Sequence, residues 1–283
     1  MRMIATIKDV KAEVKKAKQE GKSIGFVPTM GFLHEGHLSL IKKAREENDF
    51  VVVSIFVNPI QFDVKEDLES YPRDLDRDCK LVEAAAVDVL FIPSMEALYP
   101  EGYSTYVEVT GDMTKQLCGK SRNGHFKGVT TVVLKLFNII TPDHAYFGQK
   151  DAQQVAVIKK MVEDMNMDVE IVPCDIVREK DGLALSSRNV LLQDKERQDA
   201  TILSKSLLKA KEMIIKGERD AAKIRASIIE NLYKIEKAQI DYVEVVNAKT
   251  LESIEKVKGE ILIAVAVKIG KPRLIDNIQM HIS

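Results

Sequence analysis

Short apolar runs alternate with segments of helical periodicity over the first 175 residues of the chain. Residues 24–30 indicate a short buried strand. Residues 50–57 form an almost unbroken run of apolar, β-branched side chains, which is typical of a strand covered on both faces of a parallel sheet. Between them, residues 37–48 carry apolar side chains at the spacing of an amphipathic helix. Strand, helix and strand in this order predict a right-handed βαβ unit.

The same alternation continues beyond this unit and is preceded by one more helix. Thr6 and Asp9 resemble a capping box that opens a helix ended by Gly21. Further helices are expected at residues 75–86, 129–140 and 151–166, and further strands at residues 87–92, 145–147 and 169–172. Because elements of this length alternate, the pattern predicts a doubly wound α/β domain with a parallel sheet over residues 1–175.

The pattern changes in the last third of the chain. Two helices rich in Lys and Glu are expected at residues 195–216 and 221–237, followed by strand-like runs at residues 240–246, 260–269 and 273–282. Consecutive strands with short turns predict an antiparallel sheet, and hence a smaller α+β domain over residues 176–283. The sequence contains no repeat, low-complexity tract or Gly/Ser linker, so we expect the two domains to meet closely.

Composition narrows the classes of protein that remain. Lys and Arg number 42 and Asp and Glu 43, a balance that argues against a dedicated nucleic-acid surface. Cys79, Cys118 and Cys174 are far apart, which predicts reduced thiols. The first residues are too charged for a signal peptide, and no apolar run reaches the ~18–20 residues that span a bilayer. We therefore expect a cytoplasmic protein without a membrane partner.

The segment PTMGFLHEGH, residues 28–37, stands where the first predicted strand ends and the next helix begins. Ligands of open α/β sheets bind at the carboxyl ends of strands, beside helix N-termini that favour phosphate. Gly31 and Gly36 let the backbone approach such a ligand. The imidazoles of His34 and His37 can donate hydrogen bonds to phosphate oxygens.

Two other interpretations of these histidines compete. The zinc motif H-E-x-x-H needs its second histidine four positions on, whereas His37 is only three positions beyond His34 and Gly36 lies between them. The pair could also be incidental. The chain has only 5 histidines, and two of them fall at one strand–helix junction, which favours a site.

Polar side chains also follow other predicted strands. Asn58 and Gln61 come after the second buried strand, and an amide suits the hydroxyl and carboxylate groups of a small hydroxy acid. Lys150 precedes a helix, where a cation can face phosphates, and Gln154 shares a helix face with Asp151. For each of these residues the alternative is an ordinary surface position, and Asp151 could hold a ribose hydroxyl or be structural.

A turn near the junction of the two domains carries two hydroxyls and a guanidinium. Ser186, Ser187 and Arg188 suit the binding of a polyphosphate. The alternative is that Ser187 serves only as a helix N-cap.

Several of these strings resemble known families. The residues His34-x-Gly36-His37 resemble the HxGH signature of the nucleotidylyltransferase superfamily, which includes class I aminoacyl-tRNA synthetases. The wider string PTMGFLHEGHLSL is similar to the pantothenate synthetase (pantoate–β-alanine ligase) family. Similar strings follow in the family's order: SIFVNPIQF at 54–62, YPR at 71–73, RNGHFKGV at 122–129, FGQKDAQQ at 147–154 and DGLALSSRN at 181–189. The resemblance covers most of residues 24–192 and continues more weakly to the end. It departs at Gln149, where many members carry Glu, and at Asn123, where many carry Pro.

The resemblance implies an enzyme that joins (R)-pantoate and β-alanine while ATP is cleaved to AMP and pyrophosphate. The pantoate carboxylate attacks the α-phosphorus to give pantoyl-adenylate, and the β-alanine amine then displaces AMP. It implies a Rossmann-like catalytic domain for ATP and pantoate, a smaller lid domain and a homodimer. Mg²⁺ is expected with ATP, bound mainly by phosphates and water, with Asp76 and Asp78 as acidic candidates.

The resemblance also implies roles for individual residues. Charge stabilisation falls to His34, His37, Lys150 and Arg188. The segment around Ser186 stands in for the KMSKS loop of the synthetases. Pantoate would be bound by Met30, Asn58, Gln61 and Gln154. ATP would be bound by Pro28, Thr29, Met30, Gly31, His34, Gly36, His37, Gly148, Lys150, Asp151, Val177, Leu185, Ser186, Ser187 and Arg188.

Three rival functions remain within reach of the same fold. A nucleotide-cofactor adenylyltransferase would retain HxGH but not the strings around Asn58 and Lys150. A tRNA synthetase would need a basic anticodon-binding region, which the near-neutral charge does not suggest. A non-catalytic nucleotide sensor could lose its catalytic cations, whereas all of them are present here.

Overall fold

The computed structural model describes residues 1–236 and 238–283, which form two compact units. The first unit contains residues 1–109, 122–149 and 157–175. The second unit contains residues 110–121, 150–156 and 176–283. Two short segments of the first 175 residues therefore belong to the second unit.

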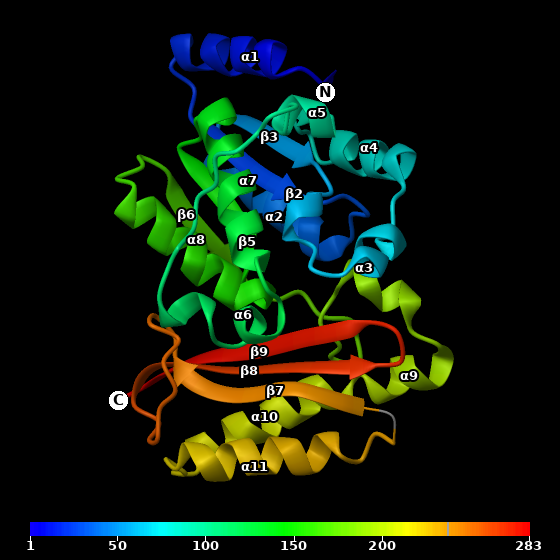
Figure 1. The fold of residues 1–283 in the computed structure, drawn as a ribbon, viewed down its shortest axis with the longest axis vertical. Coiled ribbons are helices and arrows are strands. Elements are labelled where there is room, and N and C mark those ends of the chain that lie inside the picture. The colour runs from blue at the N-terminus through cyan, green and yellow to red at the C-terminus, as the bar shows by residue number, and fades with distance from the viewer. Residues whose placement is uncertain (237) are drawn as a thin grey trace. The chain divides into compact units, whose positions relative to one another are not determined.

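A six-stranded parallel sheet forms the centre of the first unit (Figure 1). Its strand order is β1-β4-β3-β2-β5-β6. The strands are β1 (Arg2–Ile4), β2 (Ile24–Thr29), β3 (Phe50–Ile55), β4 (Val89–Phe91), β5 (His144–Gly148) and β6 (Glu170–Cys174). The parallel α/β class predicted from the sequence is confirmed, although the edge strand β1 was not expected.

Helices cover both faces of this sheet. The helices are α1 (Ile7–Gln19), α2 (Glu35–Glu47), α4 (Leu75–Ala84), α7 (His125–Ile140) and α8 (Ala152–Asp164), the last of which begins in the second unit. Val27 and Val53 share a buried cluster with side chains of α2 and α4. Phe26 points to the opposite face, where its ring packs edge-on to that of Phe137 on α7 with centroids 6.4 Å apart. The sheet is thus buried on both faces, as its unbroken apolar strands predict.

Shorter elements lie in the connections. They are η1 (Pro59–Gln61), α3 (Lys65–Ser70), α5 (Met95–Leu98), η2 (Asp112–Thr114), α6 (Cys118–Ser121), η3 (Gln149–Asp151) and η4 (Ser187–Leu191). None of them was expected, because so short a segment has no measurable hydrophobic period.

The second unit is built on a three-stranded antiparallel sheet, as predicted. Its strands β7 (Ala238–Asn247), β8 (Gly259–Ile269) and β9 (Arg273–Ile282) are covered on one face by α10 (Ile202–Ile215) and α11 (Ala221–Leu232) (Figure 1). The single helix expected at residues 195–216 is instead two, because α9 (Asp194–Asp199) ends in a tight turn before α10. The helix expected at 221–237 ends at Leu232, and residue 237 lies outside the described residues.

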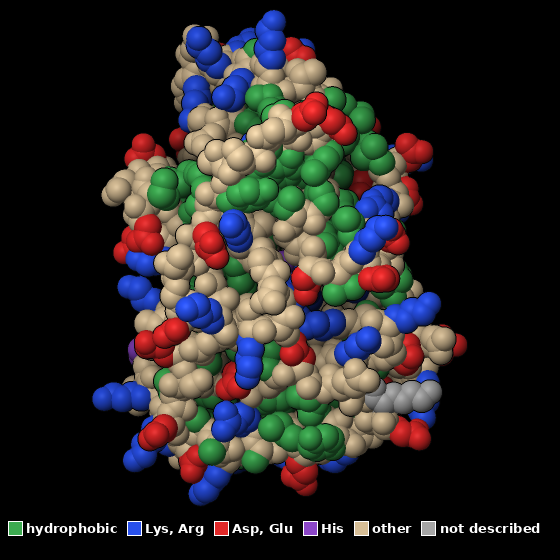
Figure 2. All heavy atoms as spheres, in the orientation of Figure 1, with side chains coloured by type: hydrophobic (Ala, Val, Ile, Leu, Met, Phe, Trp, Pro, Cys, Tyr) green, Lys and Arg blue, Asp and Glu red, His purple; other side chains and the backbone are tan. Residues whose placement is uncertain are grey.

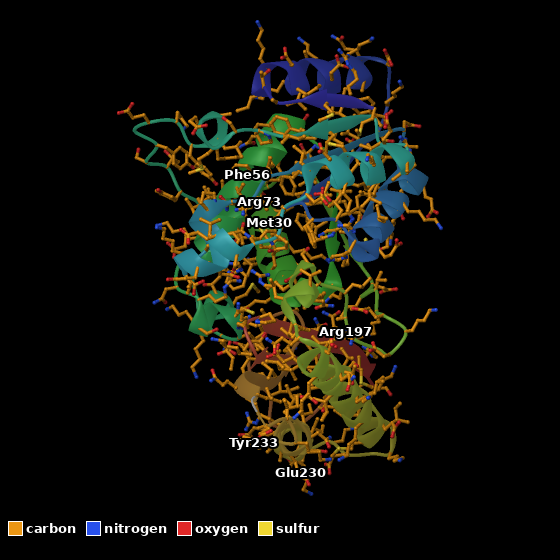
Figure 3. The ribbon with its side chains drawn as sticks, turned by 90° about the vertical axis from the view of Figure 1, so that its right-hand side faces the viewer. Met30, Phe56, Arg73, Arg197, Glu230 and Tyr233 are labelled. Carbon is orange, nitrogen blue, oxygen red and sulfur yellow. The ribbon has the colours of Figure 1, made fainter. Side chains whose placement is uncertain are left out.

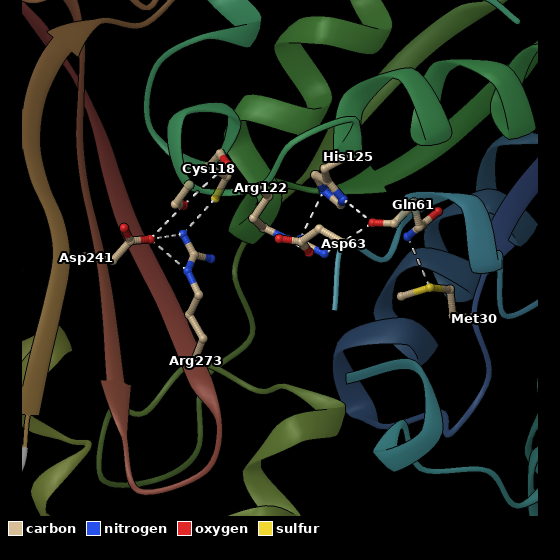
Figure 4. Close-up of polar contacts among 9 residues, drawn as sticks. Met30, Gln61, Asp63, Cys118, Arg122, His125, Asp241 and Arg273 are labelled. Atoms are coloured by element: carbon tan, nitrogen blue, oxygen red, sulfur yellow. Dashed lines mark hydrogen bonds and ion pairs between the residues drawn. The ribbon is translucent and has the colours of Figure 1, made fainter. Parts of the chain in front are cut away.

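The other face of this sheet is covered by the two segments from earlier in the chain. Leu117 and Ala152 share a buried cluster with Val246 and Leu262. Beside this cluster, the hydroxyl of Ser121 donates to the carboxylate of Asp241 at 2.9 Å, and the Nη2 of Arg273 donates to the same oxygen at 2.6 Å (Figure 4). These contacts explain why residues 110–121 and 150–156 fold with the second unit.

Surface charge and thiols agree with the composition. On the face drawn in Figure 2, basic and acidic side chains are interspersed. Cys79, Cys118 and Cys174 are all free thiols. Within the described part of the chain, no helix combines the length and apolar character needed to cross a membrane.

Candidate active site

The strand order of the parallel sheet reverses between β2 and β5. From β2 the chain continues to β3 and β4 on one side, and it later returns to β5 and β6 on the other side. In open α/β sheets, ligands bind where the strand order reverses in this way. The HxGH segment follows β2, and Lys150 follows β5 by two residues. The strands β2 and β5 are therefore neighbours in the sheet. Each of them precedes one of the two predicted ATP-binding segments.

A left-handed turn connects β2 to α2. Gly31 has φ +79° and Phe32 has φ +49°, so two consecutive residues adopt a conformation that L side chains disfavour. The carboxylate of Asp78 holds this turn, because its two oxygens accept the backbone N–H groups of Phe32 and Leu33 at 2.7 Å each. A Cβ on Gly31 would lie 3.1 Å from an Asp78 oxygen. Glycine is thus needed here for close packing within the protein itself.

The two histidines of the motif cap the helix that they precede. His34 is the N-cap of α2, and its Nδ1 accepts the N–H of Gly36 at 3.1 Å. The Nδ1 of His37 accepts the N–H of His34 at 3.3 Å. Since a backbone N–H can only donate, each neutral ring carries its proton on Nε2. The ring centroids are 4.1 Å apart, so two Nε2–H donors lie side by side at a helix N-terminus.

The acidic candidates for magnesium differ in what they contact. Asp78 is 1% exposed and both of its oxygens are used by the turn. Burial raises the pKa of Asp78, and the two N–H donors partly offset that rise. Asp76 is exposed in the first turn of α4. Among the described residues, there is no group of three or more His, Cys, Asp or Glu side chains that could hold a metal ion.

Met30 and Gln61 form the second cluster of predicted residues in the first unit. Met30 follows β2 and Phe56 follows β3, and both residues are labelled in Figure 3. The ends of these two strands pair in register at Thr29 and Ile55. Beyond β3, the Nε2 of Gln61 contacts the Sδ of Met30 at 3.2 Å (Figure 4).

Asn58 orients the Gln61 amide. It is 1% exposed, and its Nδ2 donates to the Oε1 of Gln61 at 3.0 Å and to the carbonyl of Gly128 at 3.1 Å. Its Oδ1 accepts the hydroxyl of Tyr99 at 2.9 Å. Burial raises the pKa of Tyr99 far above its usual range, so the phenol remains a donor.

Lys150, Asp151 and Gln154 belong to the second unit. Lys150 and Asp151 lie in η3, where the Lys150 carbonyl accepts the side-chain amide of Asn277 at 2.9 Å. Gln154 is half-buried on α8. Its neighbour Gln153 is buried and binds the carbonyls of Met113 and Gln116 at 2.9 and 2.7 Å. The two adjacent amides therefore differ, and Gln153 is structural.

The serine-rich turn also lies in the second unit. Ser186 is the N-cap of η4, and its Oγ accepts the N–H of Arg188 at 3.3 Å. The cap is thus Ser186 rather than Ser187, which is the first residue of η4. Leu185 and Val177 form a backbone pair, with the Leu185 N–H 3.0 Å from the Val177 carbonyl.

The predicted site residues are thus divided between the two units. The first unit contains Pro28, Thr29, Met30, Gly31, His34, Gly36, His37, Asn58, Gln61, Asp76, Asp78 and Gly148. The second unit contains Lys150, Asp151, Gln154, Val177, Leu185, Ser186, Ser187 and Arg188. The sequence did not indicate the supporting residues Tyr99, His125 and Gln153. Of these, Tyr99 lay outside every string similar to the family, whereas His125 and Gln153 lay within such strings.

A doubly wound parallel sheet with an HxGH turn after its central strand defines a nucleotide-binding α/β enzyme. The family model described as pantoate–β-alanine ligase matches residues 2–279. The chain belongs to this family. It is 62% identical over 282 residues to the pantothenate synthetase of Acetivibrio thermocellus, covering 100% of both chains. It is 58% identical over 278 residues to that of Caldicellulosiruptor bescii, covering 98% of both.

Solved structures agree with this assignment. The chain matches the pantothenate synthetase of Thermus thermophilus with a TM-score of 0.95 at 43% identity, covering 100% of both chains. It matches the pantoate–β-alanine ligase of Francisella tularensis, a complex with βγ-ATP and β-alanine, with a TM-score of 0.80 at 38% identity. That match covers 98% of this chain and 97% of the other. The protein is therefore a ligase of pantothenate biosynthesis, which removes the rival functions considered from the sequence.

Proposed function

We propose that the enzyme makes pantothenate in two steps through pantoyl-adenylate. In the first step a pantoate carboxylate oxygen bonds to the α-phosphorus of ATP, and the bond from that phosphorus to the bridging oxygen breaks to release pyrophosphate. In the second step the β-alanine nitrogen bonds to the acyl carbon, loses a proton, and AMP leaves. Because the substrate carboxylate is the nucleophile, the protein needs no covalent residue, and catalysis is positioning plus stabilisation of charge.

The adjacent imidazoles of His34 and His37, whose ring centroids are 4.1 Å apart, are the observation that carries this proposal. Their Nδ1 atoms accept backbone N–H groups, which directs two Nε2–H donors from the N-terminus of α2. Negative charge grows on the oxygens around the α-phosphorus during adenylate formation. Preorganised donors at a helix N-terminus stabilise such charge without reorganising. No step in this scheme asks either histidine to transfer a proton.

Other residues receive roles in the same scheme. Lys150 and Arg188 supply positive charge to the phosphates, with Ser186 and Ser187 as hydroxyl donors. Gln61 and Gln154 bind pantoate, and Met30 contributes to its binding. The Asn58 amide already contacts Gln61, Gly128 and Tyr99, so we assign its effect on pantoate to the orientation of Gln61.

The remaining partners follow from the family and from ATP itself. Mg²⁺ would enter with ATP and would be held mainly by phosphates and water. Of the two acidic candidates, the exposed Asp76 is the one that could contact a water on such an ion. The Francisella tularensis relative supports β-alanine and ATP as substrates, since its structure is a complex with βγ-ATP and β-alanine. We also propose a homodimer in the cytoplasm.

Isotope exchange between pyrophosphate and ATP tests the two-step chemistry. With ATP and Mg²⁺ but without β-alanine, labelled pyrophosphate should enter ATP only when pantoate is present, because the first step is then reversible on the enzyme. Rapid quenching should show a burst of pyrophosphate close to one per active site. If neither pantoate-dependent exchange nor a burst occurs while pantothenate is still formed, stepwise adenylation is wrong.

A further inference from the structure

A backbone carbonyl beside the proposed pantoate site is held by two side chains. The carbonyl oxygen of Gln61 lies 2.8 Å from the Nδ1 of His125 and 3.4 Å from the Nη2 of Arg122 (Figure 4). A second guanidinium nitrogen of Arg122 lies 3.1 Å from the Nε2 of His125. Asp63 lies 3.4 Å from the Nε of Arg122. All four residues belong to the first unit.

The chemistry of these partners sets the tautomer of His125. A carbonyl oxygen can only accept, so Nδ1 must carry a proton. A guanidinium can only donate, so Nε2 must be the bare, accepting nitrogen. The ring is therefore neutral with its proton on Nδ1, which is the opposite tautomer from that of His34 and His37.

The turn that carries Gln61 needs this support. It lies in η1, a single turn of three residues, where the N–H of Gln61 is as far as 3.4 Å from the carbonyl of Asn58. On α7, the same helix as His125, the backbone of Gly128 packs so closely that a Cβ there would lie 2.5 Å from the carbonyl of Ile60. The direction of the Gln61 side chain follows from the orientation of this weakly bonded turn.

We propose that His125 is a positioning residue for pantoate, with Arg122 fixing its tautomer. The Nδ1–H of His125 holds the carbonyl of Gln61 and thereby aims the Gln61 amide at the substrate. The inference rests on the proposed role of Gln61 in binding pantoate. It gives the string RNGHF, residues 122–126, a role in pantoate binding. This role requires no contact between the string and ATP.

Two substitutions separate the two nitrogens of the ring. In His125→Asn the side-chain amide nitrogen can occupy the place of Nδ1, so the contact with Gln61 is kept and the contact with Arg122 is lost. In His125→Gln the amide can reach only the place of Nε2, so Arg122 keeps a partner and the Gln61 carbonyl loses its donor. The same substitutions at His281, which is exposed on β9, serve as matched controls.

Steady-state kinetics should distinguish these variants. We expect His125→Gln to raise the pantoate KM about five- to tenfold, the cost of one misplaced hydrogen bond, with the ATP KM changed less than about twofold. His125→Asn should remain within about twofold of the unchanged enzyme for both substrates. Equal pantoate KM values for His125→Gln and His125→Asn, with unchanged melting temperatures, would overturn the proposal.

The variant Gln61→Ala should be measured in parallel. It distinguishes whether His125 fails to position Gln61 or whether Gln61 does not bind pantoate at all. If Gln61→Ala raises the pantoate KM but His125→Gln does not, Gln61 binds pantoate without help from His125. If Gln61→Ala leaves the pantoate KM unchanged, the assignment of Gln61 is itself wrong and the inference falls with it.

A spectroscopic measurement on the unchanged protein remains decisive even if the variants fold poorly. In ¹⁵N-labelled enzyme near neutral pH, the assigned ring of His125 should show a protonated Nδ1 and a bare Nε2. A proton on Nε2 alone, or on both nitrogens, would overturn the proposal, because neither form can accept from Arg122.

Discussion

Single residues at this site serve the fold and the chemistry with different atoms. The Nδ1 atoms of His34 and His37 cap α2, while the proposed catalytic donors are the Nε2–H groups. The cap also fixes each ring, because the backbone N–H that it accepts cannot move without unwinding the first turn of the helix. A histidine suits this position because it offers an acceptor and a donor on opposite sides of one rigid ring.

Asparagine substitutions can separate these two uses of the ring. In His34→Asn and His37→Asn the amide oxygen takes the place of Nδ1 and preserves the cap, but no donor remains at Nε2. We expect kcat to fall about 10²–10³-fold, as for the loss of an oxyanion donor, with a smaller change in ATP affinity. Rapid-quench kinetics measures the change in rate, and calorimetric ATP binding measures the change in affinity.

The matching alanine variants remove the cap as well, so they should also melt at a lower temperature. Near-normal turnover in both asparagine variants would exclude the proposed role.

At the scale of elements, the site depends on the contact between α4 and the turn before α2. Asp78 reaches from α4 to the backbone of Phe32 and Leu33, and Arg77 lies over the Phe32 ring at 5.3 Å from its centroid. The turn contains two left-handed residues, one of which is not glycine, so it would be strained without such an anchor. Asp78 therefore holds the turn that leads directly into the HxGH segment.

Asp78→Asn tests this anchoring role against a role in binding magnesium. An asparagine has one acceptor oxygen, so its NH₂ group must face one of the two backbone N–H groups that Asp78 accepts. We expect kcat to fall about ten- to hundredfold through misplacement of the loop. Because the metal is not involved, saturating Mg²⁺ should not restore activity. Titration of kcat with Mg²⁺ at fixed ATP is the measurement, and Glu83→Gln on the exposed face of α4 is the control. Full rescue by Mg²⁺ would show that Asp78 is a metal ligand.

The sequence predicted long periodic elements well and local supports poorly. The strands β2 and β3 were predicted because Phe50–Ile55 and its partner strand are buried on both faces and are therefore almost entirely apolar. The strand β1 was not, because three residues at a sheet edge carry no period. His34 and His37 were singled out because they stand where a predicted strand meets a helix, and the family resemblance then implied their roles. Tyr99 was missed because its bond to Asn58 joins residues 41 positions apart, and no local pattern records such a contact.

At the scale of the whole molecule, the predicted site residues are shared between two units that interrupt each other in sequence. The boundary passes between Gln149 and Lys150, so a proposed catalytic cation lies two residues beyond β5 but already in the second unit. Residues 110–121 and 150–156 are held by the sheet β7–β9 rather than by the sheet that precedes them in sequence. Lys150 is thus positioned by the second unit, through the bond from Asn277 to its carbonyl.

A chain truncated after residue 175 tests this division. It retains the six parallel strands and the HxGH turn, but it loses the partners that bury Leu117 and Ala152 in the second unit. In hydrogen exchange, we expect amides of β2 and β3 to stay protected. Amides of residues 110–121 and 150–156 should exchange far faster than in the intact chain, because local stability follows buried contacts.

In the truncated chain Lys150 would no longer be held in position and Arg188 would be absent. Pantoate-dependent pyrophosphate exchange should therefore also be lost. The intact chain carrying Arg188→Ala is the control, since it should lose exchange activity while both segments remain protected. Protection of these segments in the truncated chain would show that the first unit holds them by itself, and the assignment of Lys150 to the second unit would then be wrong.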